Sequence, residues 1–477
     1  MKKIILAGLV LSLYSCSGDF LNIYPETSLN EGNFYSSDEE IITLVNGCYT
    51  SLRDIEKRTH WVISELKSDV LDQQTSSVAG DFTTDRMDAV IAGSDNLALD
   101  DFWNFSYKGI YNCNKAISVL EGGSHVWSNP ALKSRSSGEV YFLRALYYFN
   151  LVRQFGDVPV VTEPVTGLEA VNIKRSPVAD IYALITEDLT KAQTHLEAAT
   201  TVEENGRVNY GASLGLLGKV YLTTKNYPAA EVMLKKVIDL GKFSLLPDYK
   251  NVFDPANKDY KETLFSVQYS EAAAALSNQF IFFNAPYTSK GEVTNRPNIA
   301  LSLAGNMRPS QDLIKSFEVG DKRKSVSIAY WRGPDWNGIV ADLPYCAKYK
   351  APQTAALNWA GDNFPVLRYS DILLMYAEVL NNLNRTAEAI PFVNQVRERA
   401  GLKPAAGLAK TQLDMLIEKE RMLEFCFENQ RWYDLVRRGR ALEVMRAHGK
   451  QAPDAQVLAA IPSEQILINK LNQNTGY

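Results

Sequence analysis

The chain has 477 residues, of which 46% are hydrophobic and 22% are charged, so it is long enough and apolar enough to bury a large core. Its formal net charge of −5 is small for this length, and the broad basic surface of a nucleic-acid-binding protein is not present. The 24 Tyr, 19 Phe and 7 Trp residues are a generous supply for a surface that recognises flat, amphipathic ligands.

The N-terminal residues predict an export signal with a lipid anchor. A positive Met-Lys-Lys start precedes an apolar run over 4–13, which is far shorter than the about 20 residues of a membrane-spanning helix. The run ends in L-Y-S-C, which is similar to a lipobox in which Cys16 becomes the lipidated first residue. A plain signal peptide with a chance cysteine is the alternative. We expect residues 1–15 to be the signal peptide and acyl chains on Cys16 to hold the protein to a membrane.

The remaining cysteines are Cys48, Cys113, Cys346 and Cys426. Three of them lie in helical-looking, apolar surroundings and are predicted to be small buried residues. The sequence has no C-x-x-C motif, so neither a zinc site nor a redox pair is indicated. A disulfide between two of them stays open, since export leads to an oxidising compartment.

Hydrophobic spacing predicts helices through the first half of the chain. The first starts at a cap formed by Ser37 and Asp38 and runs to about Glu56. Residues 61–101 are rich in Ser, Thr, Asp and Gly, and we interpret them as loops with short helices that can carry binding residues. Three further helices are predicted over 102–121, 137–155 and 178–196. The helix over 137–155 is apolar almost all round and is expected to be deeply buried.

Two distant segments share one spacing pattern. Six positions recur at offsets 0, 4, 7, 16, 20 and 23, namely Leu214, Gly218, Tyr221, Ala230, Leu234 and Val237, and then Leu373, Ala377, Leu380, Ala389, Val393 and Val396. Each segment is predicted to be an antiparallel helix pair with a tight turn and small residues where the helices cross. The spacing is tetratricopeptide-like, in the class of about 34 residues. Two unrelated helical hairpins could share two or three of these positions, but hardly six.

Between the repeats lies an irregular insert over 243–365, with Gly, Pro and Asn clusters and short β-like runs such as T-L-F-S-V-Q-Y. It holds three of the seven tryptophans. Its run Y-W-R-G-P-D-W is predicted to place Trp331 and Trp336 on either side of a Gly-Pro turn. Arg332 and Asp335 then offer a donor and an acceptor to the hydroxyl groups of a ligand.

A run that begins at residue 417 reads I-E-K-E-R-M-L-E-F-C-F-E-N-Q-R-W-Y-D-L-V-R-R-G and is predicted to start as a helix. One interpretation makes its acidic residues a pair of hydrolytic acids, chosen from Glu424, Glu428 and Asp434. The other is an ion-paired helix with Arg421 and Arg431 at hand, in which Arg421 pairs with Glu424 or Glu418. We favour the ion-paired helix, since carboxylates at helical spacing beside arginines usually serve structure.

This run resembles the signature E-R-x-x-E-x-x-x-E-x-x-R-W-x-D-L-x-R of SusD-like (SusD/RagB) nutrient-binding lipoproteins of Bacteroidetes. Other segments are similar to the same family in order along the chain: the opening C-S-G-D-F-L-N-I-Y-P, then R-A-L-Y-Y-F-N-L with F-G-D-V-P, then P-S-Q-D-L-I-K-S-F-E-V-G-D-K-R, and a final I-P-S-E with Q-N-T-G-Y. Two departures concern turns of the tail only: Thr475 replaces the usual Pro, and Asn469 is not followed by Pro. The resemblance therefore extends from Cys16 to Tyr477.

The resemblance implies a mainly α fold, an α/α superhelix of tetratricopeptide-like helix pairs with a long loop-rich insert. A single SusD-like domain would span 16–477. Within it, a helical-repeat scaffold is expected at about 36–242 and 366–440, a ligand-binding insert at about 243–365, and a C-terminal tail at 441–477.

The function implied by the resemblance is that of a lipid-anchored outer-membrane protein facing the cell exterior. Such a protein captures an extracellular oligosaccharide and delivers it to a SusC-like TonB-dependent transporter. A peptide ligand, or a tetratricopeptide protein-interaction scaffold, are the alternatives. No catalytic residues are expected, and the four scattered His with no H-E-x-x-H motif agree with that. No cofactor or nucleic-acid partner is expected, and whether a structural Ca²⁺ is bound is not readable from the sequence.

Sugar capture requires flat aromatic side chains that stack on a pyranose, with polar groups nearby for its hydroxyls. We therefore predict a ligand site made of Trp331, Trp336, Trp359, Tyr287, Phe82, Arg86 and Asp69. For each loop aromatic a structural role is an equal alternative, since most tryptophans are largely buried. Trp103, Trp127 and Trp432 lie beside helices and are predicted to be core residues. Trp61 fits either role.

Overall fold

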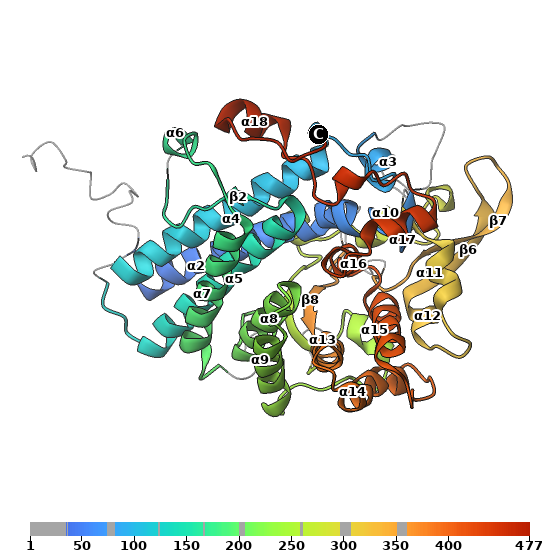
Figure 1. The fold of residues 1–477 in the computed structure, drawn as a ribbon. Helices are drawn as coiled ribbons and strands as arrows, with labels where there is room; N and C mark the ends of the chain where they lie inside the picture. The colour runs from blue at the N-terminus through green and yellow to red at the C-terminus, as the bar shows by residue number, and fades with distance from the viewer. Residues whose placement is uncertain are drawn as a thin grey trace, which may run out of the picture.

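The computed structural model describes residues 35, 37–73, 82–122, 125–165, 167–199, 206–257, 261–295, 307–350 and 360–477. Three of the predicted functional groups lie outside this description: Cys16, Trp359 and the side chain of Phe82. The fold of the described residues is mainly α-helical, and its strands are short (Figure 1).

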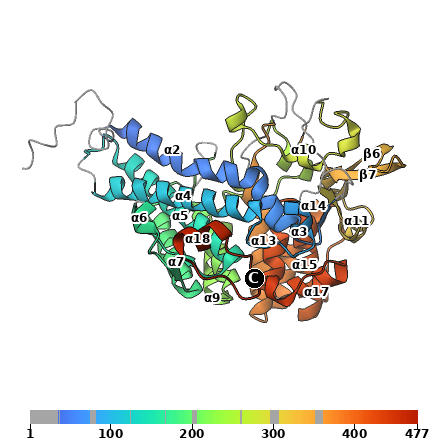
Figure 2. The ribbon, with the colours of Figure 1, turned by 90° about the horizontal axis from the view of Figure 1, so that it is seen from above.

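Long helices packed side by side form the N-terminal part of the molecule (Figures 1 and 2). They are α2 (Asp38–Asp54), α4 (Leu97–Gly122), α5 (Pro130–Phe155) and α7 (Val178–Leu196). The predicted cap of α2 is confirmed, because the Ser37 hydroxyl accepts from the Glu40 backbone N–H and the Glu40 carboxylate accepts from that of Ser37. The α5 helix is buried along most of its length, as its apolar sequence predicts. Two π-helical stretches continue α2 into the core: η3 (Ile55–Thr59) and η4 (Trp61–Glu65).

Part of the stretch interpreted as loops belongs to the core instead. Trp61 is 0% exposed, and its indole is stacked near Phe280 and Phe427, with ring centroids 5.7 and 6.4 Å apart. Trp61 is therefore a structural residue.

The short elements of this region are β1 (Leu71–Gln73) and α3 (Phe82–Asp88). Those between α5 and α7 are β2 (Val158–Pro159), α6 (Gly167–Ala170) and β3 (Arg175–Ser176).

The structure confirms both predicted helix pairs. They are α8 (Tyr210–Thr223) with α9 (Tyr227–Asp239), and α13 (Tyr369–Asn382) with α14 (Thr386–Arg399). The two pairs are neighbours, because α9 packs on α13 although about 130 residues separate them (Figure 1). Gly218 of α8 faces Leu234 of α9 so closely that a Cβ atom on Gly218 would lie 2.6 Å from the leucine side chain. A small residue is required at this crossing.

Gly218→Val should therefore lower the free energy of unfolding by about 1–3 kcal/mol, as expected when a packed interface must accept extra methyl groups. Urea denaturation followed by circular dichroism measures this change. Gly47→Val is the matched control, since Gly47 also lies in a helix but has open space where its Cβ would be. Equal effects at the two positions would show that the close crossing does not select glycine.

The segment between the repeats folds into short elements. In chain order they are η5 (Tyr249–Phe253), β4 (Thr263–Val267), η6 (Ala274–Leu276), α10 (Phe280–Asn284), η7 (Tyr287–Ser289), β5 (Met307–Pro309), α11 (Gln311–Ser316), α12 (Arg323–Ser327), β6 (Ile328–Pro334), β7 (Val340–Cys346) and β8 (Phe364–Arg368). Every sheet in the described chain has two strands, paired β1–β5, β2–β3, β4–β8 and β6–β7, and all four pairs are antiparallel. The β-like run T-L-F-S-V is β4, and its pairing with β8 connects the start of this segment to its end.

The C-terminal part consists of α15 (Lys410–Phe425), α16 (Arg431–Arg437), α17 (Ala441–His448), η9 (Asp454–Gln456) and α18 (Ser463–Asn469). The α15 helix packs on α13 and α14, whereas Gln465 of α18 donates to Asn104 of α4. The four cysteines beyond residue 16 are all buried and all free thiols, which confirms the burial predicted for three of them. Within the described ranges, we find no helix that combines the length and the apolar character needed to cross a bilayer.

Candidate functional site

The acidic residues of the run that begins at residue 417 are buried in an ion-pair network. Glu424 is 0% exposed and contacts the guanidinium groups of Arg368, Arg399 and Arg323. Glu428 contacts Arg368 at 2.8 Å and the Lys348 ammonium at 2.7 Å. Burial by itself would raise the pKa of Glu424, but Arg399, Arg368 and Arg323 outweigh burial and hold the pKa well below its usual range. Glu424 is therefore ionised and cannot act as a proton donor.

The partners of these acids are not the ones that helical spacing predicts. Arg421 pairs with Asp371 of α13 and with Asp434, each at 2.7 Å, and the expected pairing with Glu424 or Glu418 is wrong. The acidic face of α15 faces the protein interior, so its carboxylates pair with basic residues of other elements. The interpretation as a structural ion-paired helix is confirmed, but the partners come from across the fold.

Asp69 belongs to the same buried interior, and its assignment to a ligand loop is wrong. Both of its carboxylate oxygens accept from Arg431, from Nε and Nη2, each at 2.7 Å. Asp69 is only 6% exposed. Burial alone would raise its pKa, but the Arg431 guanidinium holds the pKa below its ordinary value. This fork-to-fork pair fixes the chain before β1 to the start of α16.

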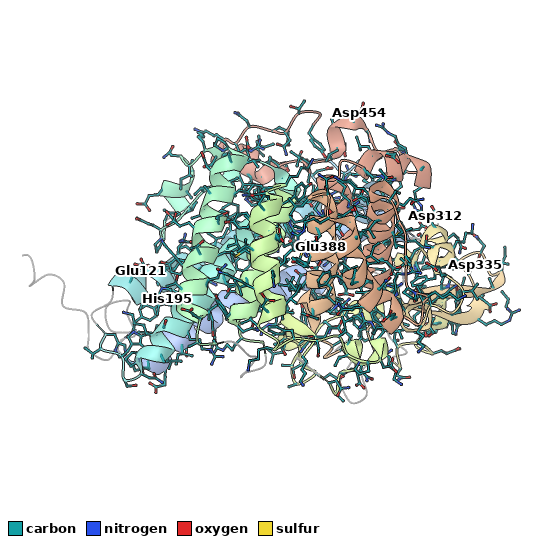
Figure 3. The ribbon with its side chains drawn as sticks, turned by 60° about the horizontal axis from the view of Figure 1, so that its bottom comes forward. Glu121, His195, Asp312, Asp335, Glu388 and Asp454 are labelled. Carbon is teal, nitrogen blue, oxygen red and sulfur yellow. The ribbon has the colours of Figure 1, made fainter. Side chains whose placement is uncertain are left out.

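The strands β6 and β7 form a hairpin that extends from one end of the molecule (Figures 1 and 2). Figure 3 labels Asp335 at its tip, at the opposite end of the molecule from Glu121 and His195. The predicted Gly-Pro turn is wrong, because Gly333 and Pro334 are the last residues of β6. The turn is formed by Asp335, whose carboxylate accepts from the backbone N–H groups of Asn337 and Ile339, at 2.8 and 2.9 Å.

Trp331 lies in the β6 strand, and its indole contacts Glu292 and lies over Gly333. Its indole Nε1 donates to a Glu292 carboxylate oxygen at 2.7 Å. Its ring covers Gly333, the next residue on the same face of the strand, so that a Cβ on Gly333 would lie 1.9 Å from the ring. Glycine at this position lets the indole lie flat along the strand. The Glu292 contact spans 39 residues, and no spacing in the sequence indicates it.

Trp336 lies in the turn and stacks on Tyr287 of η7. The ring centroids are 4.6 Å apart and the ring planes differ by 4°, which is an offset stack. Tyr287, Trp331 and Trp336 are all partly exposed, and we call them the hairpin cluster. The hairpin exposes further apolar residues, namely Tyr330 at 49%, Ile339 at 63% and Val340 at 61%, and Tyr330 lies on the face of β6 opposite to Trp331. The structure thus places three of the seven predicted site residues on or beside the hairpin.

The charged groups predicted beside this cluster already have partners. Arg332 pairs with Asp342 across the hairpin at 3.0 Å, and both side chains are exposed. Arg86 makes a two-pronged contact with Asp95, at 3.0 and 2.9 Å, and the hydrogen bonds from Arg86 lower the pKa of Asp95. In the described part of the chain, no group of three or more His, Cys, Asp and Glu side chains is arranged to hold a metal ion.

The tryptophans predicted as core are placed as expected. Trp103 and Trp432 are 3% and 0% exposed. Trp103 contacts Phe155 edge to face at a centroid distance of 5.1 Å. Trp127 is partly buried and packs against the main core. Among the described tryptophans, Trp331 and Trp336 of the hairpin are partly exposed without belonging to the main core, and they differ in this from Trp103, Trp127 and Trp432.

Comparison with known proteins gives consistent matches along the chain. The SusD family model matches residues 334–465, and a second family model, described as starch-binding and associating with the outer membrane, matches residues 19–222. SusD-like protein P2 of Formosa agariphila is 26% identical, over 100% of this chain and 99% of that protein.

Solved structures share the fold. A laminarin-binding SusD-like protein superposes with a TM-score of 0.77 at 23% identity, covering 93% of this chain and 100% of that chain. NanU of B. fragilis superposes with a TM-score of 0.80 at 23% identity, covering 95% and 100%. The fold, the two matched family models and the full-length relative lead to one conclusion: the chain is a SusD/RagB-like protein with a tetratricopeptide-like helical architecture.

Proposed function

We propose that this protein is a lipid-anchored outer-membrane protein that binds an extracellular oligosaccharide at the hairpin cluster. The observation that carries the proposal is the set of three partly exposed rings at one end of the molecule, one fixed by Glu292 and two stacked on each other. Rigid aromatic faces that remain accessible are the surface on which the apolar side of a sugar ring stacks. The glycan-related descriptions of one matched family model and of a structural neighbour agree with this chemistry.

The bound oligosaccharide would be delivered to a SusC-like TonB-dependent transporter. Binding without cleavage fits the burial and full ion pairing of the acids that could have served hydrolysis, Glu424 and Glu428. The proteins of the SusD-like family are binding proteins. We therefore expect the protein to leave its ligand intact.

The experiment is a binding screen of oligosaccharides and peptides against the purified protein, followed by an assay for new reducing ends on every glycan that binds. The proposal expects at least one glycan to bind and none to be cleaved. Binding of peptides alone would favour the peptide-uptake alternative, and new reducing ends would overturn the assignment as a pure binding protein.

The proposed anchor leads to a separate prediction. Cys16→Ala should move the protein out of the membrane fraction or leave its signal peptide uncleaved, because the acyl chains that hold a lipoprotein to the bilayer are attached to that sulfur. Cell fractionation with a fatty-acid probe measures both effects. Cys48→Ala is the control, because Cys48 is a buried free thiol. Undiminished labelling of the Cys16 variant would contradict the anchor.

A further inference from the structure

A pocket lies where α2 meets β4, and no residue of the hairpin cluster lines it. Its volume is about 220 Å³, and its walls come from α2, from β4 with the following Gln268, and from Gly206 and Arg207. A protein cavity of about 150 Å³ is large enough for benzene. The pocket therefore has room for one six-membered ring with substituents.

The pocket contains two arginines that differ in their partners. Arg207 is balanced by Glu139, which it contacts at 2.8 Å and which Arg135 also contacts, at 3.2 Å. Arg53 lies at the inner end of α2, and its Nε atom is buried without a hydrogen-bond partner among the described residues. A buried N–H of a charged group without an acceptor is unfavourable. Arg53 lines the pocket, so an anionic acceptor brought there by a ligand would meet its guanidinium group.

The other walls are apolar rings and fixed polar groups. The rings of Tyr49 and Phe265 lie with centroids 6.4 Å apart. The Tyr49 hydroxyl is fixed, since it donates to Glu139 at 2.9 Å. The Gln268 amide is fixed as well, because it donates to Ser266 Oγ at 2.8 Å and accepts from the Asn363 side chain. These groups hold their positions without a ligand.

Gly206 shapes this wall through its backbone. Its φ is +81°, in the left-handed region that favours glycine. A Cβ at this position would lie 2.3 Å from Gln268 Cγ. Only glycine therefore lets the chain turn here while Gln268 keeps its place in the pocket.

We propose that this pocket binds a six-membered sugar ring that carries a carboxylate, with the carboxylate on Arg53 and the ring against Tyr49. A guanidinium fork matches a planar carboxylate, and aromatic rings match the apolar face of a sugar better than they match a small inorganic anion. One unpartnered guanidinium nitrogen suits one anionic group, because Arg207 is already balanced by Glu139. This site is separate from the hairpin cluster and goes beyond the oligosaccharide capture proposed there.

The test is isothermal titration of the full chain in detergent with D-glucuronate, D-glucose and inorganic phosphate. Glucuronate should bind at least tenfold more tightly than either of the other two. Arg53→Gln should weaken glucuronate binding at least tenfold, because it removes the charge that faces the carboxylate. Arg135→Gln is the matched control, because Arg135 contacts Glu139 but does not line the pocket. This variant should bind glucuronate like the unmodified protein.

The unmodified protein alone can overturn the proposal, whatever the variants do. Equal affinity for glucose would remove the role of the carboxylate, and equal affinity for phosphate would reduce the site to a general anion site. Unchanged affinity in a folded Arg53→Gln protein would exclude Arg53. The double variant Trp331→Ala with Trp336→Ala should keep its glucuronate affinity, so failure at this pocket and failure at the hairpin cluster give different results.

Discussion

Arg368→Met is expected to lower the free energy of unfolding by about 3–5 kcal/mol, the range found when one partner of a buried ion pair is removed. Arg368 is 1% exposed, and its guanidinium donates to Glu262, Glu424 and Glu428 at 2.8 to 2.9 Å. Methionine fills the space of the aliphatic stem but supplies no charge. Three buried carboxylates then lose their shared cation. Urea denaturation at pH 7, followed by circular dichroism, measures the loss.

Arg332→Met is the matched control. Arg332 makes the same kind of contact with Asp342 at 3.0 Å, but the two side chains are 70% and 60% exposed. Water and salt screen such a pair, so its removal should change stability little. Comparable losses in the two variants would show that burial does not set the importance of these pairs.

The effect of Arg368→Met should also depend on pH in a defined direction. The pKa of Glu424 in the folded protein lies well below its ordinary value of 4.5, so its stabilising contribution is present above that value and is lost as the pH falls. Protonated carboxyl groups no longer need a cation. The difference in stability between the unmodified protein and the variant should therefore shrink as the pH is lowered below about 4.5. A difference that stays constant would point to lost packing around the arginine stem instead.

Much of the helical fold could be predicted because it depends on local spacing. The six shared offsets place Gly218 and Ala377 where two helices cross, and the α7 bounds agree with the prediction at both ends. Apolar periodicity specifies which face of a helix is buried, whatever the rest of the chain does. The predicted helix over 102–121 starts five residues late, because the actual first turn of α4, from Leu97, is partly exposed and carries a weaker apolar pattern.

The errors over Asp69 and over the partners of Arg421 have a common physical origin, since both depend on contacts between residues far apart in the sequence. The small polar residues that follow Asp69 indicate a loop, but Arg431, 362 residues later, pairs with it in the core. Trp331 and Trp336 look alike in the sequence, yet one is fixed by Glu292 and the other by Tyr287. Composition shows where aromatic residues are concentrated, but only the fold shows which rings remain exposed.

Trp331→Ala combined with Trp336→Ala should weaken oligosaccharide binding by more than tenfold. A ring stack contributes about 1 kcal/mol beyond the area it buries, and 1.4 kcal/mol corresponds to about a factor of ten in affinity. Loss of both indoles also removes buried area from the complex, so the total exceeds that value. The variant should still fold, because the hairpin extends from the body and both rings are partly exposed. Isothermal titration with a glycan found in the screen measures the binding, and a melting curve measures the fold.

Trp103→Ala is the control that separates a site residue from a core residue. Trp103 is 3% exposed and packs edge to face on Phe155, so its loss should cost about 3–5 kcal/mol of stability. The folded fraction of this variant should bind the glycan as the unmodified protein does. If the Trp331→Ala, Trp336→Ala protein instead melted early and kept its ligand, the Tyr287–Trp336 stack would serve the stability of the hairpin. The sugar would then bind to another part of the surface, because its binding would not require the two indoles.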